Sequence, residues 1–155
     1  MSSVFSFPRR IEFCETDAAG IAHFSSLIIY MEQAEHALLR SVGLSVAASH
    51  SSNSNPEHPS ASAYSWPRVK VECDFCSPGR FEDVISVEST VCTFGKKSIT
   101  YRHHLSIGST TIATGKMTSV CCVREGGSLV STTIPQSIRD LLYPFYGGSD
   151  LSTPV

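Results

Sequence analysis

The stretch from Cys14 to Leu44, CETDAAGIAHFSSLIIYMEQAEHALLRSVGL, decides the fold of this chain. It begins with two carboxylates, Glu15 and Asp17, passes through a small, turn-forming AAG segment, and continues as a strongly apolar segment. Residues 4–14 before it alternate as a strand does, so we expect the two acids to stand where that strand ends. An acidic residue at the start of so apolar a segment suggests a functional role.

Residues 25–42 are predicted to form a helix. Apolar residues recur there at steps of three and four, which is the period of a helix with a buried face. The polar residues cover only part of the circumference, so we expect other elements to wrap around this helix. Ser25 or Ser26 can cap its start, and Gly43 suits its end.

The rest of the chain indicates antiparallel strands within one domain. Apolar and polar residues alternate with period two, and glycine-containing turns separate the strands at short intervals. Residues 45–65 are expected to form a mobile loop and residues 148–155 a frayed tail, which leaves a single domain over residues 1–147. Strands are expected over residues 69–75, 84–93, 99–107 and 110–123, and Pro135 is expected to open a short terminal helix.

The composition excludes several classes of protein. The chain has 155 residues, of which 41% are hydrophobic, enough for one domain with a real core. Its net charge of −2 gives no general attraction for nucleic acid. The sequence has no apolar run of membrane-spanning length and no signal-peptide pattern at its start. We therefore expect a cytoplasmic protein that binds neither nucleic acid nor membrane.

The cysteine and histidine pairs do not predict a metal site. Cys73 and Cys76 form a lone C-x-x-C without a second pair, and positions three apart on a strand point to opposite faces. We interpret the cysteines as structural thiols and expect no bound metal. His103 and His104 are neighbours on a predicted strand, so one is expected to face the core and the other solvent or an interface.

The order of elements favours an α+β architecture in which an antiparallel sheet curls around one long helix. Residues 9–44 resemble the hotdog-fold acyl-CoA thioesterases, most closely the 4-hydroxybenzoyl-CoA thioesterase branch, and residues 81–88 and 95–103 resemble later strands of that family. The matching D-x-A-G-I-x-x-F pattern consists of Asp17, Ala19, Gly20, Ile21 and Phe24, with Gly43-Leu44 after the helix. The resemblance implies the hotdog fold, an antiparallel five-stranded sheet wrapped around the central helix.

The resemblance also implies an activity and an assembly. It implies hydrolysis of an aromatic, 4-hydroxybenzoyl-CoA-like or medium acyl-CoA, with coenzyme A as part of the substrate and no separate cofactor. It implies a homodimer or homotetramer with active sites between protomers. One chain alone would then be catalytically incomplete.

The stretch from Cys14 to Leu44 contains groups that suit thioester hydrolysis. A helix N-terminus offers unpaired N–H groups and a positive dipole end, which can stabilise the oxyanion of a thioester. The resemblance assigns this role to the backbone N–H of Phe24. Asp17, across the Gly20 turn, would act as nucleophile or as general base on water. Glu15 would be a surface or supporting acid, and Gly20 is included among the substrate-binding residues.

His23 departs from the nearest relatives, which carry a tryptophan there. It is a candidate catalytic residue that contacts the acyl group or polarises the carbonyl, or else it is a packed polar aromatic residue. The departure leaves the acyl group open.

Coenzyme A carries phosphates, and a basic pair is the candidate to hold them. Lys96 and Lys97 follow Gly95 in a predicted hairpin and resemble the family's basic pair at the nucleotide end. Ser98 is a weaker candidate. Ser119 stands where relatives carry an arginine, which suggests a different or looser mode of binding the phosphates of coenzyme A.

Several alternatives remain open. The substrate could be 1,4-dihydroxy-2-naphthoyl-CoA or a short or medium aliphatic acyl-CoA. A non-catalytic module that binds acyl-CoA or an acyl-carrier protein would not need Asp17, and a dehydratase would need a catalytic histidine such as His23.

Overall fold

The computed structural model describes residues 2–46 and 63–148. Most of the expected mobile loop at residues 45–65 and nearly all of the expected frayed tail lie outside the described residues. Within the described ranges, no helix combines the length and the apolarity needed to cross a bilayer.

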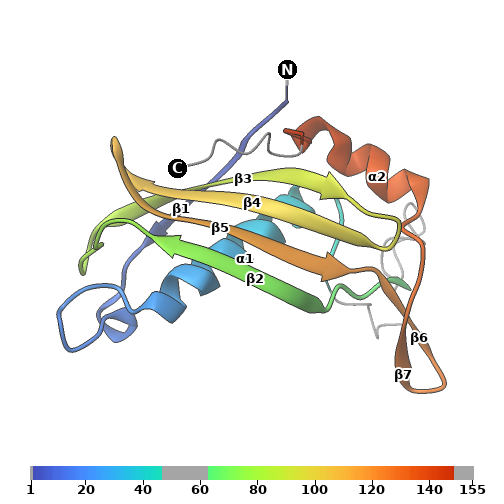
Figure 1. Cartoon of the computed structure of the whole chain (residues 1–155), viewed down its shortest axis with the longest axis horizontal. Helices are drawn as coiled ribbons and strands as arrows, with labels where there is room; N and C mark the ends of the chain where they lie inside the picture. Colours follow the sequence, from blue (N-terminus) through green and yellow to red (C-terminus); the bar gives the residue numbers. More distant parts are fainter. Residues whose placement is uncertain (1, 47–62, 149–155) are drawn as a thin grey trace.

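A five-stranded antiparallel sheet packs against one long helix, α1 (Phe24–Ser41), which confirms the predicted hotdog fold (Figure 1). The strand order is β1-β3-β4-β5-β2, so β1 and β2 form the two edges. The strands are β1 (Phe5–Arg10), β2 (Arg68–Phe75), β3 (Val84–Phe94), β4 (Ser98–Ile107) and β5 (Thr110–Val120).

The sheet begins and ends differently from the sequence prediction. The first strand stops at Arg10, and the 3-10 helix η1 (Phe13–Glu15) follows where a continuing strand was expected. The expected strand at 110–123 is two strands, because β5 ends at Val120 and β6 (Cys122–Glu125) pairs with β7 (Ser128–Ser131).

The β6–β7 hairpin turns at two glycines. Gly126 and Gly127 have φ angles of +56° and +86°, and two successive left-handed residues make the tight turn that matches strand twist. A short helix, α2 (Gln136–Leu142), and the 3-10 helix η3 (Tyr143–Phe145) follow. Pro135 precedes α2 as its N-cap residue.

The C-terminal end of α1 follows the prediction. Gly43 has φ +79°, and its N–H donates to the Arg40 carbonyl at 3.1 Å. The Leu44 N–H donates to the Leu39 carbonyl at 2.8 Å. These two bonds form a Schellman motif, which glycine favours because it adopts the left-handed conformation without strain.

His103 and His104 face opposite sides of β4, as predicted. His103 is buried, with Nδ1 2.8 Å from the Ser89 hydroxyl. Burial, together with the nearby charge of Arg68, lowers the pKa of His103 to about 3, so its ring stays neutral. His104 lies on the outer face, where Nδ1 is 3.6 Å from a Glu88 oxygen.

The helix lies close to the sheet because β5 has a glycine beneath it. A Cβ atom at Gly115 would lie 2.6 Å from the Met31 sulfur and 2.8 Å from the backbone oxygen of Glu72. The methionine side chain can move, but the backbone oxygen belongs to the paired strand and cannot easily do so. Gly115 therefore sets how closely α1 approaches the centre of the sheet.

We expect Gly115→Ala to lower the free energy of unfolding by about 1–3 kcal/mol, because the added methyl overpacks the helix–sheet contact. Urea unfolding measures this difference. Gly147→Ala is the matched control, since a Cβ there meets only ordinary contacts with Thr90. Equal stability of the two variants would contradict this account of the contact.

Candidate active site

A tight hairpin carries Asp17. Thr16 and Ala22 pair as an antiparallel bridge, and the Asp17 N–H donates to the Ile21 carbonyl at 2.8 Å. The Gly20 N–H donates back to the Asp17 carbonyl at 2.9 Å, and Gly20 has φ +74°. Gly20, predicted to bind substrate, therefore supplies the backbone conformation that closes this turn.

The turn also orients the Asp17 carboxylate. Oδ1 accepts the Ala19 N–H at 2.8 Å and the Ile21 N–H at 3.5 Å. No described residue donates a hydrogen bond to Oδ2. One oxygen thus holds the side chain in place, and the other is available to a ligand.

The N-terminus of α1 is capped by His23, whereas the sequence favoured Ser25 or Ser26. His23 Nδ1 accepts the Ser25 N–H at 3.3 Å and lies 2.7 Å from the Ser25 hydroxyl. The His23 carbonyl accepts the Ser26 N–H at 2.9 Å. The Phe24 N–H has no acceptor among the described residues. The first amide of the helix is therefore left for a ligand.

Asp17 and Phe24 line one cavity of about 420 Å³. The rings of Phe24 and Phe75 meet edge to face at 6.3 Å across it. Most of its lining is apolar, and it consists of Asp17, Ile21, Ala22, Phe24, Leu27, Phe75, Cys76, Ser77, Pro78 and Gly79. A carboxylate, a helix N-terminus and an apolar recess thus meet in one place.

His23 lies behind the cavity. Its ring lies tilted against the Phe24 ring with centroids 4.4 Å apart, and its Nδ1 is engaged in the helix cap. Both contacts correspond to the packed polar aromatic residue that the sequence offered as one of two interpretations.

Lys96, Lys97 and Ser98 lie at the opposite end of α1. They form the β3–β4 hairpin, which Figure 1 shows at the far end of the sheet from the start of α1. The Lys97 ammonium donates to the Ser131 carbonyl at 3.4 Å and to its hydroxyl at 3.3 Å. Within one chain, the structure does not bring the lysines to the cavity that Asp17 and Phe24 line.

Ser119, which stands where relatives carry an arginine, is buried beneath α1. Its hydroxyl donates to Glu35 at 3.3 Å, and Arg68 donates to both side chains. Burial raises the pKa of Glu35, and the charge of Arg68 opposes that rise. The alternation of β5 directs Ser119 to the helix face of the sheet, which agrees with a phosphate contact that does not use this position.

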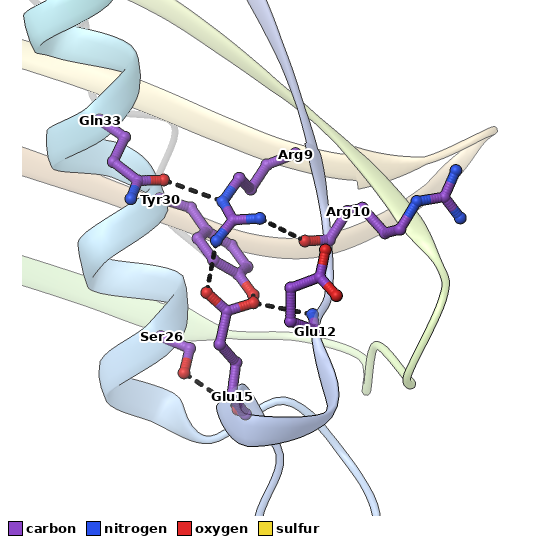
Figure 2. Close-up of polar contacts among 7 residues, drawn as sticks. All are labelled: Arg9, Arg10, Glu12, Glu15, Ser26, Tyr30 and Gln33. Carbon is purple, nitrogen blue, oxygen red and sulfur yellow. Dashed lines mark hydrogen bonds and ion pairs between the residues drawn. The ribbon is translucent and has the colours of Figure 1, made fainter.

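Glu15 lies in the 3-10 helix η1, and not at the end of a strand as the alternation before it had predicted. The turn η1 directs its side chain between β1 and α1 (Figure 2). Sequence reasoning missed this arrangement because nothing in the residue pattern at 11–15 identifies a 3-10 turn.

Comparison with known proteins identifies the family. The family model described as the thioesterase superfamily matches residues 19–114, which is more than half of the chain. The chain belongs to the thioesterase superfamily.

Individual proteins of known structure or activity resemble this chain at low sequence identity. A 1,4-dihydroxy-2-naphthoyl-CoA hydrolase of Synechococcus elongatus is 23% identical over 138 residues, which cover 89% of this chain and 94% of that protein. A 1,4-dihydroxy-2-naphthoyl-CoA thioesterase from Synechocystis superposes with a TM-score of 0.73 at 19% identity, covering 98% of this chain and all of that one. A mutant 4-hydroxybenzoyl CoA thioesterase in complex with its acyl-CoA superposes with a TM-score of 0.74 at 18% identity, covering 90% and 98%.

The cap predicts how His23 variants behave. We expect His23→Ala to lower the free energy of unfolding by about 1 kcal/mol, because the Ser25 N–H loses its acceptor. His23→Asn keeps a capping oxygen and should retain both the stability and the thioester turnover of the native chain. Denaturant unfolding and a thiol-release assay measure the two. A stable Asn variant with strongly reduced turnover would instead assign His23 to the chemistry.

Proposed function

We propose that this protein is an acyl-CoA thioesterase that hydrolyses an aromatic acyl-CoA to the free acid and coenzyme A. One observation carries the proposal: the unbonded N–H of Phe24 and the half-free carboxylate of Asp17 border the same cavity. Thioester hydrolysis needs a donor for the developing oxyanion and a group that delivers the attack.

In the proposed reaction the thioester carbonyl oxygen accepts the Phe24 N–H. The helix dipole and this hydrogen bond stabilise the negative charge that develops on the oxygen. Asp17 either attacks the carbonyl carbon or removes a proton from an attacking water. The C–S bond breaks, and the sulfur leaves as the thiol of coenzyme A with a proton that comes from water. Where water attacks, the free acid forms in this step. Where Asp17 attacks, a water then hydrolyses the mixed anhydride, which releases the acid and restores the Asp17 carboxylate.

The apolar part of the cavity supports an aromatic acyl group. The edge-to-face pair of Phe24 and Phe75 leaves both rings more than half exposed, at 58% and 53%. A flat acyl ring would bury these surfaces and gain stacking contacts. The relatives named for 1,4-dihydroxy-2-naphthoyl-CoA and 4-hydroxybenzoyl CoA also act on aromatic acyl groups.

A second copy of the chain would complete the site along the edge strand β2. Among the described residues this strand pairs only with β5, and a side left unpaired there is a template for another strand. Val69, Val71 and Phe75 on this strand are 60%, 41% and 53% exposed. Pairing of two β2 strands would bury this apolar surface.

Antiparallel pairing of two β2 strands would also bring the basic residues of the second copy towards the cavity. The Phe75 end of β2 borders the cavity, whereas its Arg68 end lies opposite Ser119 and the start of β4. Two-fold pairing brings the Arg68 end of one chain beside the Phe75 end of the other. The Lys96–Lys97 hairpin of the second copy would then lie roughly two strand spacings, about 10 Å, from the β2 edge, where the nucleotide phosphates can meet it.

Asp17→Asn tests the proposed function. We expect kcat for benzoyl-CoA hydrolysis to fall by about 10²–10⁴-fold, because the amide can neither attack nor accept a proton. Thiol release measured with a thiol reagent gives the rate, and Asp140→Asn on the exposed face of α2 is the matched control. Hydrolysis at the native rate in the Asp17 variant would refute the role of Asp17. Acyl-CoA binding without turnover by the native chain would indicate a binding module.

Charging the β2 edge tests the second copy. We expect the native chain to run as a dimer or larger assembly in light scattering, and Val69→Lys with Val71→Lys to shift it to monomer with at least about tenfold lower kcat/KM. Leu129→Lys with Val130→Lys places the same charge on exposed β7 and should change neither property. An active native monomer would contradict the shared site.

A further inference from the structure

The carboxylate of Glu15 ties three elements together (Figure 2). Oε1 accepts a hydrogen bond from Arg9 of β1 at 2.5 Å. Oε2 accepts the Tyr30 hydroxyl of α1 at 2.6 Å and the Glu12 N–H at 2.8 Å. Charged acceptors make stronger hydrogen bonds than neutral ones, so this side chain is a strong link between β1, η1 and α1.

The side chains that bind Glu15 also contact one another and α1. The Arg9 Nε donates to Gln33 on α1 at 3.0 Å, and its guanidinium carbon lies 5.0 Å from the centre of the Tyr30 ring. Burial, then the hydrogen bond and charge of Glu15, raises the pKa of Tyr30, so its hydroxyl remains a donor.

The backbone of Glu15 reaches the start of α1. Its carbonyl accepts the His23 N–H at 2.8 Å and the Ser26 hydroxyl at 3.0 Å. The Glu15–His23 bond is the base of the hairpin whose next pairs are Thr16–Ala22 and Asp17–Ile21. Asp17 therefore lies two residues from Glu15 on one arm, and Phe24 follows directly after the other arm.

Glu15 itself does not face the cavity. Its side chain is 19% exposed, both carboxylate oxygens are engaged, and the cavity lining in the described part of the chain does not include it. A direct role in the chemistry would require these hydrogen bonds to break. Its influence on the reaction must instead pass through the hairpin.

We propose that Glu15 is a positioning residue of the thioester site. Its carboxylate anchors η1 between β1 and α1, and its carbonyl fixes the base of the hairpin, so that the distance between the Asp17 carboxylate and the Phe24 N–H stays constant. Displacements of about 1 Å in such a pair reduce rates by roughly 10²-fold. This inference rests on the proposed thioesterase activity.

Glu15→Gln tests it, because glutamine keeps the shape but loses the charge and one acceptor. We expect kcat for benzoyl-CoA to fall by about 10- to 100-fold while KM changes less than about threefold. Tyr30→Phe removes one of the three donors to Glu15 and should lower kcat by a few-fold. Ile138→Ala in α2 is the control, because it destabilises the distant core without touching the hairpin.

The double variant separates positioning from stability. If Glu15 acts through Asp17, Glu15→Gln should slow the Asp17→Asn variant no further, so the two effects should not multiply. The inference is overturned if Glu15→Gln keeps the native kcat. It is also overturned if Ile138→Ala, at the same thermal stability as Glu15→Gln, loses as much kcat, because the loss would then follow from stability alone. A fully active Asp17→Asn variant would refute the role of Asp17, whereas failure of the native chain to hydrolyse acyl-CoA would overturn the proposed function itself.

Discussion

The start of α1 is the constraint on which the rest of the structure depends. The first amides of a helix need acceptors from outside the helix, and here His23 satisfies those of Ser25 and Ser26. The Phe24 N–H is left unbonded among the described residues and borders a cavity. The packing of α1 on the sheet, including the close approach at Gly115, keeps this amide in a fixed place.

The arrangement also explains why an acid precedes so apolar a helix. The hairpin at residues 16–22 returns the chain on itself, so Asp17 and Phe24 border one cavity despite their separation in sequence. In the proposed reaction the acid provides the attack and the amide stabilises the oxyanion. Glu15, two residues from Asp17, would be the link that joins this hairpin to β1 and α1.

Much of the fold could be predicted because periodicity reports burial directly. The apolar stripe of α1 and the alternation of β3 to β5 are properties of the residues themselves, and both agree with the burial in the structure. The η1 turn and the His23 cap could not be predicted, because they depend on hydrogen bonds between residues whose approach the pattern does not fix. The glycine pair Gly126-Gly127 is typical of a tight turn between two strands. In the sequence it indicated only the end of the strand before it.

The candidate site was predictable only in part. Asp17 and Phe24 belong to a local motif, so their meeting at one cavity follows from a short stretch. The relation of Lys96 and Lys97 to that cavity depends on a second copy of the chain in our proposal, and one sequence carries no direct record of such pairing. A match to relatives likewise gives the position of Ser119 but not the surroundings of its side chain, which contacts Glu35.

The most direct test is a crystal structure of the protein with phenacyl-CoA, a ketone analogue that cannot be hydrolysed. We expect the ketone oxygen about 3 Å from the Phe24 nitrogen, with the Asp17 carboxylate on the other side of the carbonyl carbon at about 3–3.5 Å. A ketone oxygen bound away from the Phe24 amide, with Asp17 out of reach of the carbonyl, would contradict this expectation.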